Sequence, residues 1–328
     1  MTCRALLTCF LLGVCSYAQS GPTFAERLGW KSTDRVLILH MDDAGMSSDS
    51  NLGIERVLEH GAARSLSVMM PCPWVPQIVR YLKAHPGTDA GLHLTLTSEW
   101  REYRWGPLTG ISAPGLIDPE GALWRSVGDV VAHASAEEVD REIRAQLDRA
   151  EKMGFHPTHL DSHMGTLFAN AAFLEKYVRL GMEKRIPVMF PGGHDTYIRE
   201  DLRATPERLV TFQKMGEELW NAGLPVLDDL HNTSYGWKPP AGMNDAQLQH
   251  WRTGRYMETL QQLKPGLTMV IMHCTSPTGV FPLISDSGEL RKADMLAMLD
   301  PEFQAFLKQN GFIVTTWEEA MERRGKAH

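Results

Sequence analysis

Four segments of this chain carry side chains that can bind a metal ion or move a proton. They hold two adjacent carboxylates or one or more histidines, at residues 42–43, 91–93, 158–163 and 272–273. One carboxylate and two imidazoles form a common ligand set for a catalytic divalent metal, which leaves other coordination positions to water and substrate. Such a metal activates a water molecule, a second carboxylate can take its proton, and another histidine can return the proton to a leaving group. Together the segments predict a metal-dependent hydrolytic site.

Each segment alone has a simpler interpretation. Asp42 and Asp43 follow a short apolar run, so one could cap a helix and the other could be a solvated loop residue. A lone histidine at a strand end is more often a hydrogen-bonded core residue than a ligand. Adjacent acids do repel each other unless a cation or a shared proton compensates. If the strands are parallel, all four segments lie at one rim of the sheet, and this coincidence favours a shared site.

The elements that must position these residues alternate between strands and helices. Short apolar runs predict strands at residues 36–42, 65–70, 90–97, 158–161, 186–190, 224–227, 269–273 and 312–316. Helical patterns lie between most of them, at residues 52–60, 75–84, 136–153, 171–181, 206–222, 245–263 and 301–309. This alternation predicts an α/β fold with a parallel sheet. Because no glycine-rich nucleotide motif follows the first strand, we expect a distorted (β/α) barrel rather than a doubly wound cofactor fold.

Two long connections interrupt this regular order, at residues 98–135 and 232–245. The first contains Trp100 and the second contains Tyr235, each among glycines or prolines. Long loops in compact domains are often functional, and aromatic faces can stack on sugar rings. Packing of these aromatics against the barrel is an equally good interpretation. Residues 281–300 have no clear pattern and could form a turn or a lid.

Composition and charge limit the classes of partner. Hydrophobic residues make up 43% and charged residues 22% of the 328 residues, which is typical of a globular protein with a substantial core. The formal net charge is −7 and no basic run is present, which argues against nonspecific binding to nucleic acid or an anionic membrane. We expect one domain, at residues 19–328.

The N-terminus has the pattern of a cleaved secretory signal at residues 1–18. Arg4 precedes an apolar run that is too short to span a bilayer, and small residues precede the expected cleavage after Ala18. We therefore expect a secreted or periplasmic protein. A lipoprotein anchor at Cys15 is less favoured, because Val14 stands where a small residue is expected. After cleavage only Cys72 and Cys274 remain, which rules out a disulfide framework and leaves a single bridge open.

Several segments resemble the YdjC-like carbohydrate deacetylases, also called the ChbG/HpnK family. Residues 39–45, Leu-His-Met-Asp-Asp-Ala-Gly, resemble that family's Asn-Ala-Asp-Asp-Phe-Gly. Residues 91–97 are similar to its Gly-Leu-His-Leu-Asn-Leu-Thr, and residues 65–70 match its second strand. The most distinctive string is Pro-Thr-His-Leu-Asp-Ser-His at residues 157–163. The resemblance covers roughly residues 35–275.

This resemblance implies a distorted (β/α) barrel of the polysaccharide-deacetylase type. It also implies metal-dependent removal of N-acetyl groups from amino sugars or their short oligomers. Carried over position by position, it assigns Asp43, His93 and His163 to the metal and Asp42 to the role of general base. His273 matches the family's late-strand histidine and is our candidate for the general acid.

The same resemblance leaves other features to be decided. We expect His159 and Asp161 to orient His163 or to contact the substrate. It favours Mg or Zn as the metal, with Mn or Co as alternatives, and a homodimer is left open. The chain departs from the family after His163, where Met-Gly-Thr-Leu-Phe replaces further histidines, and after His273, where Cys-Thr-Ser-Pro follows. These departures leave the substrate open.

Two alternatives to an N-deacetylase remain. The same site could serve a carbohydrate O-esterase or another amidohydrolase. An exported, non-catalytic sugar-binding protein could hold a structural metal, or could have lost it. The adjacent pair of Asp42 and Asp43 disfavours this second alternative, because a structural metal has no need of a neighbouring base.

Overall fold

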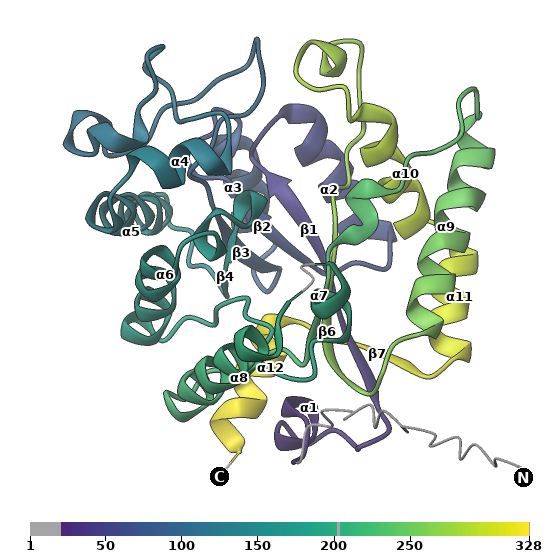
Figure 1. Ribbon diagram of the computed structural model, residues 1–328. Helices are drawn as coiled ribbons and strands as arrows, with labels where there is room; N and C mark the ends of the chain where they lie inside the picture. The colour runs from purple at the N-terminus through teal and green to yellow at the C-terminus, as the bar shows by residue number, and fades with distance from the viewer. Residues whose placement is uncertain (1–20, 202–203, 328) are drawn as a thin grey trace, which may run out of the picture.

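A curled sheet of seven parallel strands forms the centre of the molecule (Figure 1). The structure is a computed structural model that describes residues 21–201 and 204–327. The strands are β1 (Arg35–Ala44), β2 (Ser65–Val68), β3 (Asp89–Leu94), β4 (Leu160–Ser162), β5 (Asp229–His231), β6 (Gly266–Met272) and β7 (Phe312–Val314). Their order is β4-β3-β2-β1-β6-β5, and β7 also pairs with β1.

Helices surround this sheet (Figure 1). They are α1 (Phe24–Arg27), α2 (Ser48–His60), α3 (Val75–Ala84), α4 (Val127–His133), α5 (Ala136–Lys152), α6 (Ala171–Lys184), α7 (Thr196–Asp201), α8 (Pro206–Asn221), α9 (Asp245–Gln261), α10 (Gly288–Met298), α11 (Pro301–Gln309) and α12 (Trp317–Lys326). Short 3-10 turns include η3 (His163–Phe168) and η4 (Thr233–Gly236). Within the described part of the chain, none of the helices has the length and apolar character needed to cross a bilayer.

The gap between the two outer strands of the sheet is bridged by an irregular segment rather than by regular strands. Val188 bridges to Leu160 of β4, and Pro191 bridges to Leu227, just before β5. The strands predicted at residues 186–190 and 224–227 are thus reduced to isolated bridges. The prediction of a distorted (β/α) barrel in a single domain is confirmed.

Strand β1 lies at the centre because its residues are buried on both faces. Arg35 is the one β1 residue that is not fully buried, and Leu37 pairs across to both β6 and β7. Helix α2 follows β1 and begins at a cap by Ser47, whose Oγ accepts a hydrogen bond from the backbone N–H of Ser50. The carboxyl ends of the strands meet at one rim, where parallel α/β proteins place their chemistry.

The segment without a clear pattern at residues 281–300 contains helix α10. This helix packs against α9 and α2, and its inner face carries Arg291 and Asp294, both buried. Because charged side chains on this face are paired inside the protein, the helix lacks the apolar stripe by which an amphipathic helix is recognised.

The two cysteines within the described residues do not form a bridge. Cys72 and Cys274 are both buried and free. The predicted signal peptide at residues 1–18 lies outside the described residues, so it stays a prediction.

Candidate active site

Asp43, His93 and His163 lie together at the carboxyl ends of β1, β3 and β4. Oδ1 of Asp43 is 3.3 Å from Nε2 of His93 and 3.3 Å from Nδ1 of His163. The two histidine nitrogens are 3.1 Å apart. Ligand atoms about 2.1 Å from a metal lie roughly 3.0–3.4 Å from one another, so this triangle has the spacing of one face of a coordination shell.

The backbone and an arginine both direct Asp43 toward this triangle. Asp43 has a φ of +65°, a left-handed conformation that is uncommon outside glycine and is often found at functional sites. Its Oδ2 accepts a hydrogen bond of 2.6 Å from Arg291, while Oδ1 is buried without a hydrogen-bond partner among the described residues. Burial alone would raise the pKa of this carboxyl, but the charge of Arg291 and the two histidines hold it well below its usual range.

In each of the two histidines, the ring nitrogen that faces away from the triangle contacts a carboxylate. Nδ1 of His93 lies 2.7 Å from Oδ1 of Asp161, and Nε2 of His163 lies 3.1 Å from Oε1 of Glu99. A carboxylate that accepts a hydrogen bond from one nitrogen leaves the other free to bind a metal. The unpartnered oxygen and the two oriented imidazoles therefore fit a divalent metal.

The contacts of Asp161 correct one expectation. Asp161 contacts His93 rather than His163, because the pairing of β3 with β4 places His93 directly opposite Asp161. Burial opposes the ionised form of Asp161, but His93 and His40 lower its pKa. Asp161 is almost fully buried and, unlike Asp43, His93 and His163, is not part of the described cavity lining.

His159 also lies behind the site and not in it. Its ring is fully buried and stacks on Trp317 with ring centroids 5.3 Å apart. Gly91 makes room for it, since a Cβ on Gly91 would approach Nε2 of His159 to 2.4 Å. The expectation that His159 orients His163 or contacts the substrate is therefore corrected. Burial lowers the pKa of His159 to about 4, so the ring is neutral.

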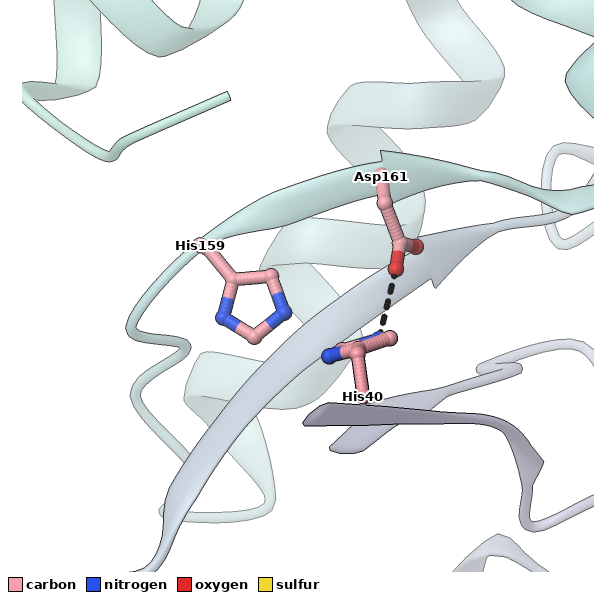
Figure 2. Close-up of side chains that lie close together, drawn as sticks. All are labelled: His40, His159 and Asp161. Carbon is pink, nitrogen blue, oxygen red and sulfur yellow. Dashed lines mark ion pairs between the residues drawn. The ribbon is translucent and has the colours of Figure 1, made fainter. Parts of the chain in front are cut away.

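His40 is a buried residue that connects two carboxylates of the site. Its Nε2 lies 3.0 Å from Oδ2 of Asp161, the ion pair drawn in Figure 2, and 3.2 Å from Oδ1 of Asp42. Ser65 and Ser67 of β2 contact its two ring nitrogens at 2.8 and 3.1 Å. Burial disfavours the imidazolium, but the two carboxylates raise the pKa of His40 to about 9.

His40, His159 and Asp161 together have the composition of a second metal site (Figure 2). Both ring nitrogens of His40 already contact serine hydroxyls, at 2.8 Å for Nδ1 and 3.1 Å for Nε2, and neither is left free for a metal. This group therefore acts as a buried charge network behind the site.

Asp42 and His273 face each other beside the triangle. Oδ2 of Asp42 is 3.8 Å from Nε2 of His93 and 4.0 Å from Nε2 of His273. The backbone N–H of His273 donates a hydrogen bond of 3.0 Å to Asp294 on α10. Burial and the nearby charge of Arg291 lower the pKa of His273, so it is neutral at pH 7.

The site opens into a cavity of about 690 Å³. Trp100 and Tyr235, from the two long loops, line it beside Arg291. Other aromatics pin the first loop: Tyr103 donates a hydrogen bond to the carbonyl of Met46, and Nε1 of Trp105 donates to that of Thr97. The packing interpretation thus applies to Tyr103 and Trp105, whereas Trp100 and Tyr235 line the cavity.

Comparison with known proteins gives the family. Residues 36–309 match the family described as YdjC-like protein. The chain belongs to the YdjC-like family. A carbohydrate deacetylase of Thermus thermophilus is 32% identical over 302 residues, which cover 90% of this chain and 97% of the relative. A carbohydrate deacetylase of Geobacillus stearothermophilus is 24% identical over 287 residues, or 87% of this chain and 98% of the relative.

The chain also resembles a further deacetylase over part of its length and a solved structure over most of it. A chitooligosaccharide deacetylase of Yersinia enterocolitica is 30% identical over 134 residues, which cover 40% of this YdjC-like chain and 49% of the relative. A crystal structure from Enterococcus faecalis V583, of a proposed cellobiose-phosphate cleavage protein, has a TM-score of 0.68 and 18% identity. It covers 87% of this chain and 98% of the other, and this likeness supports the fold alone.

Three residues of this YdjC-like site were not found from the sequence: Arg291, Glu99 and His40. Arg291 and Glu99 lie outside the family segments, in regions without a clear secondary-structure pattern. His40 lies within one, at the position of asparagine in the family string, and this difference was the one available signal.

Proposed function

We propose that this chain is a metal-dependent hydrolase that removes N-acetyl groups from amino sugars or short oligosaccharides. The observation that carries the proposal is the triangle of Asp43, His93 and His163 at 3.1–3.3 Å, with a carboxylate behind each imidazole. Family membership supports the same reaction, since relatives with this sequence pattern are named carbohydrate deacetylases.

Asp43, His93 and His163 would hold the metal through Oδ1, Nε2 and Nδ1. A divalent metal there would polarise the acyl oxygen and lower the pKa of a water molecule that attacks the carbonyl carbon. The soft imidazoles and single carboxylate suit Zn, Mn or Co, and Mg with more water ligands. Arg291 keeps Asp43 ionised and leaves its Oδ1 available.

The proton transfers fall to Asp42 and His273. Oδ2 of Asp42 accepts a proton from the attacking water as the new carbon–oxygen bond forms. Neutral His273, with Nε2 4.0 Å from that oxygen, takes the proton and delivers it to the amide nitrogen as the carbon–nitrogen bond breaks. The products are acetate and a free amine. His40 holds the other oxygen of Asp42 and keeps Oδ2 turned toward the site.

The test compares two leaving groups with one protein preparation. We expect free amine from N-acetylglucosamine oligomers when metal-stripped protein is reloaded with Zn, Mg, Mn or Co in turn. If acetate is released from O-acetylated sugars and no amine from N-acetylated sugars, the protein is an esterase and not an N-deacetylase. Tight metal binding without either product would favour a non-catalytic binding protein.

A further inference from the structure

The cavity of the proposed active site has two unlike ends. One end holds the charged groups around Asp43, from β1, β3 and α10. The other end lies against the opposite side of the barrel, where the irregular segment joins β4 to β5. We call this end the apolar chamber; its wall consists of Phe168, Met189, Pro191, Ile198, Phe212 and Leu230.

The chamber offers few polar partners among the described residues. Arg208 is exposed on α8, at the mouth, and Oγ of Ser162 already accepts a hydrogen bond from the backbone N–H of Leu167. At this end of the cavity Oδ1 of Asn232 is buried without a partner, whereas the other unpartnered buried atoms of the described lining, on Asp42, Asp43 and His273, belong to the charged end. Apart from Phe168, which is half-buried, the wall side chains are themselves buried; Met189 and Leu230 are each 5% exposed.

This wall suits an aliphatic group better than a sugar ring. A sugar hydroxyl that leaves water without finding a new hydrogen bond weakens binding, and the few polar groups at this end of the cavity are outnumbered by the hydroxyls of a sugar ring. A methylene group that leaves water for an apolar wall strengthens binding about three- to fourfold.

We infer that the substrate carries an alkyl chain of several carbons, which occupies the apolar chamber while the amide lies at Asp43, His93 and His163. The inference rests on the proposed amide hydrolysis and assigns amphiphilic amino sugars as its substrate class, with either an acetyl group or a longer acyl group as the group removed. This alkyl chain can belong to either of two parts of the substrate: the acyl group of the amide itself, or an alkyl group on the anomeric oxygen.

Two substrate series separate these sources. One runs from N-acetyl- to N-octanoyl-glucosamine, and the other from methyl to octyl N-acetyl-β-glucosaminide, all below their micelle concentrations. We expect kcat/KM to rise about threefold per methylene in one series over at least the first four carbons. Cleavage whose kcat/KM is flat in both series, but grows with the number of sugar units, would overturn the inference.

Variants of the wall give a readout that does not depend on overall activity. Leu230→Asn should lower the slope of log kcat/KM against chain length, whereas Leu230→Met, which keeps the wall apolar, should preserve it. Phe212→Asn and Phe212→Leu repeat the comparison on helix α8, in case the strand variant does not fold. If the slope of log kcat/KM against chain length is the same in the Asn variant and its apolar counterpart, at either position, the alkyl chain of the substrate does not contact this wall.

Binding without turnover separates failure of the inference from failure of the proposed function. Octyl β-glucoside has no amide to cleave, so its binding can be measured by calorimetry whether or not the protein is a deacetylase. We expect it to bind at least tenfold more tightly than methyl β-glucoside, and less so in Leu230→Asn. Tight binding of octyl β-glucoside without amide cleavage would contradict the proposed reaction but support the apolar chamber as a binding site. Equal affinities for octyl and methyl β-glucoside would contradict the role of the chamber.

Discussion

Arg291 donates a hydrogen bond of 2.6 Å to Oδ2 of Asp43, and both side chains are almost fully buried. The pair joins helix α10 to the end of the first strand. It satisfies one oxygen of Asp43 and leaves the other facing two imidazoles. The geometry of the proposed metal site thus depends on a contact between residues 248 positions apart in the chain.

Removing the arginine should destabilise the metal-free protein in particular. Arg291→Met removes the cation that is hydrogen-bonded to the buried Oδ2 of Asp43, which should lower the free energy of unfolding by about 3 kcal/mol. Added Zn should recover part of this loss, because the metal supplies the missing positive charge. Urea unfolding with and without metal measures both effects. Lys152→Met, at an exposed ion pair on α5, is the control and should change little. Equal losses for the two variants would contradict the role of Arg291.

Loss of the partner of His163 should weaken metal binding. Glu99 lies 3.1 Å from Nε2 of His163, so Glu99→Gln should lower metal affinity by roughly 10- to 100-fold. Glu102→Gln, at an exposed position in the same loop, should not. Competition with a fluorescent chelator measures the metal affinity of both variants. An unchanged affinity in Glu99→Gln would show that Glu99 does not support metal binding.

Metal binding should release protons at neutral pH. Burial opposes protonation of His163, but Glu99 and Asp43 raise its pKa to about 9 in the metal-free protein, and Asp42 and Asp161 likewise raise that of His93. A metal must displace these protons, so its apparent affinity should increase with pH up to about 9. Calorimetry of Zn binding in buffers of different ionisation enthalpy counts the protons. Binding enthalpies that do not depend on the buffer would refute the prediction.

His40 should make stability depend on pH. Its pKa is raised from 6.5 to about 9 on folding, so its charge contributes stability that is fully present below pH 6.5 and is lost as pH rises through 9. In His40→Gln the metal-free protein should therefore lose less stability between pH 7 and pH 9 than wild type does. Parallel stability curves over this range would show that His40 is not charged.

His40 should also affect turnover through Asp42. His40→Gln should lower kcat about tenfold with little change in KM, because it loosens the proposed base. In an Asp42→Asn background the same change should have almost no further effect on kcat. Multiplicative losses in the double variant would show that His40 does not act through Asp42.

Much of the site could be predicted because strand ends are local features of the sequence. Asp43 follows a short apolar run, and His93 and His163 lie in or just after predicted strands, so parallel pairing brings all three to one rim. Arg291 could not be found this way, since its helix carries paired charges where an apolar stripe is expected. Its partner is known only once α10 has packed beside β1.

The prediction of which residues contact the histidines failed for a different reason. Asp161 was expected beside His163, two residues along the chain, but strand register sets its contacts and places it opposite His93. Register depends on the pairing of β3 with β4, which short strands do not reveal in sequence. His159 was misplaced because its burial depends on the space left by Gly91.

The central claim is that Asp43, His93 and His163 bind the metal on which deacetylation depends. The most direct measurement titrates metal-stripped protein with Zn or Mg and follows bound metal and free amine together, in wild type, Asp43→Ala and Asp42→Asn. We expect activity to saturate at one metal per chain in wild type. We expect Asp43→Ala to lose metal and amine release together, and Asp42→Asn to bind metal without turnover. Full activity in metal-free protein, or wild-type metal binding by Asp43→Ala, would contradict this claim.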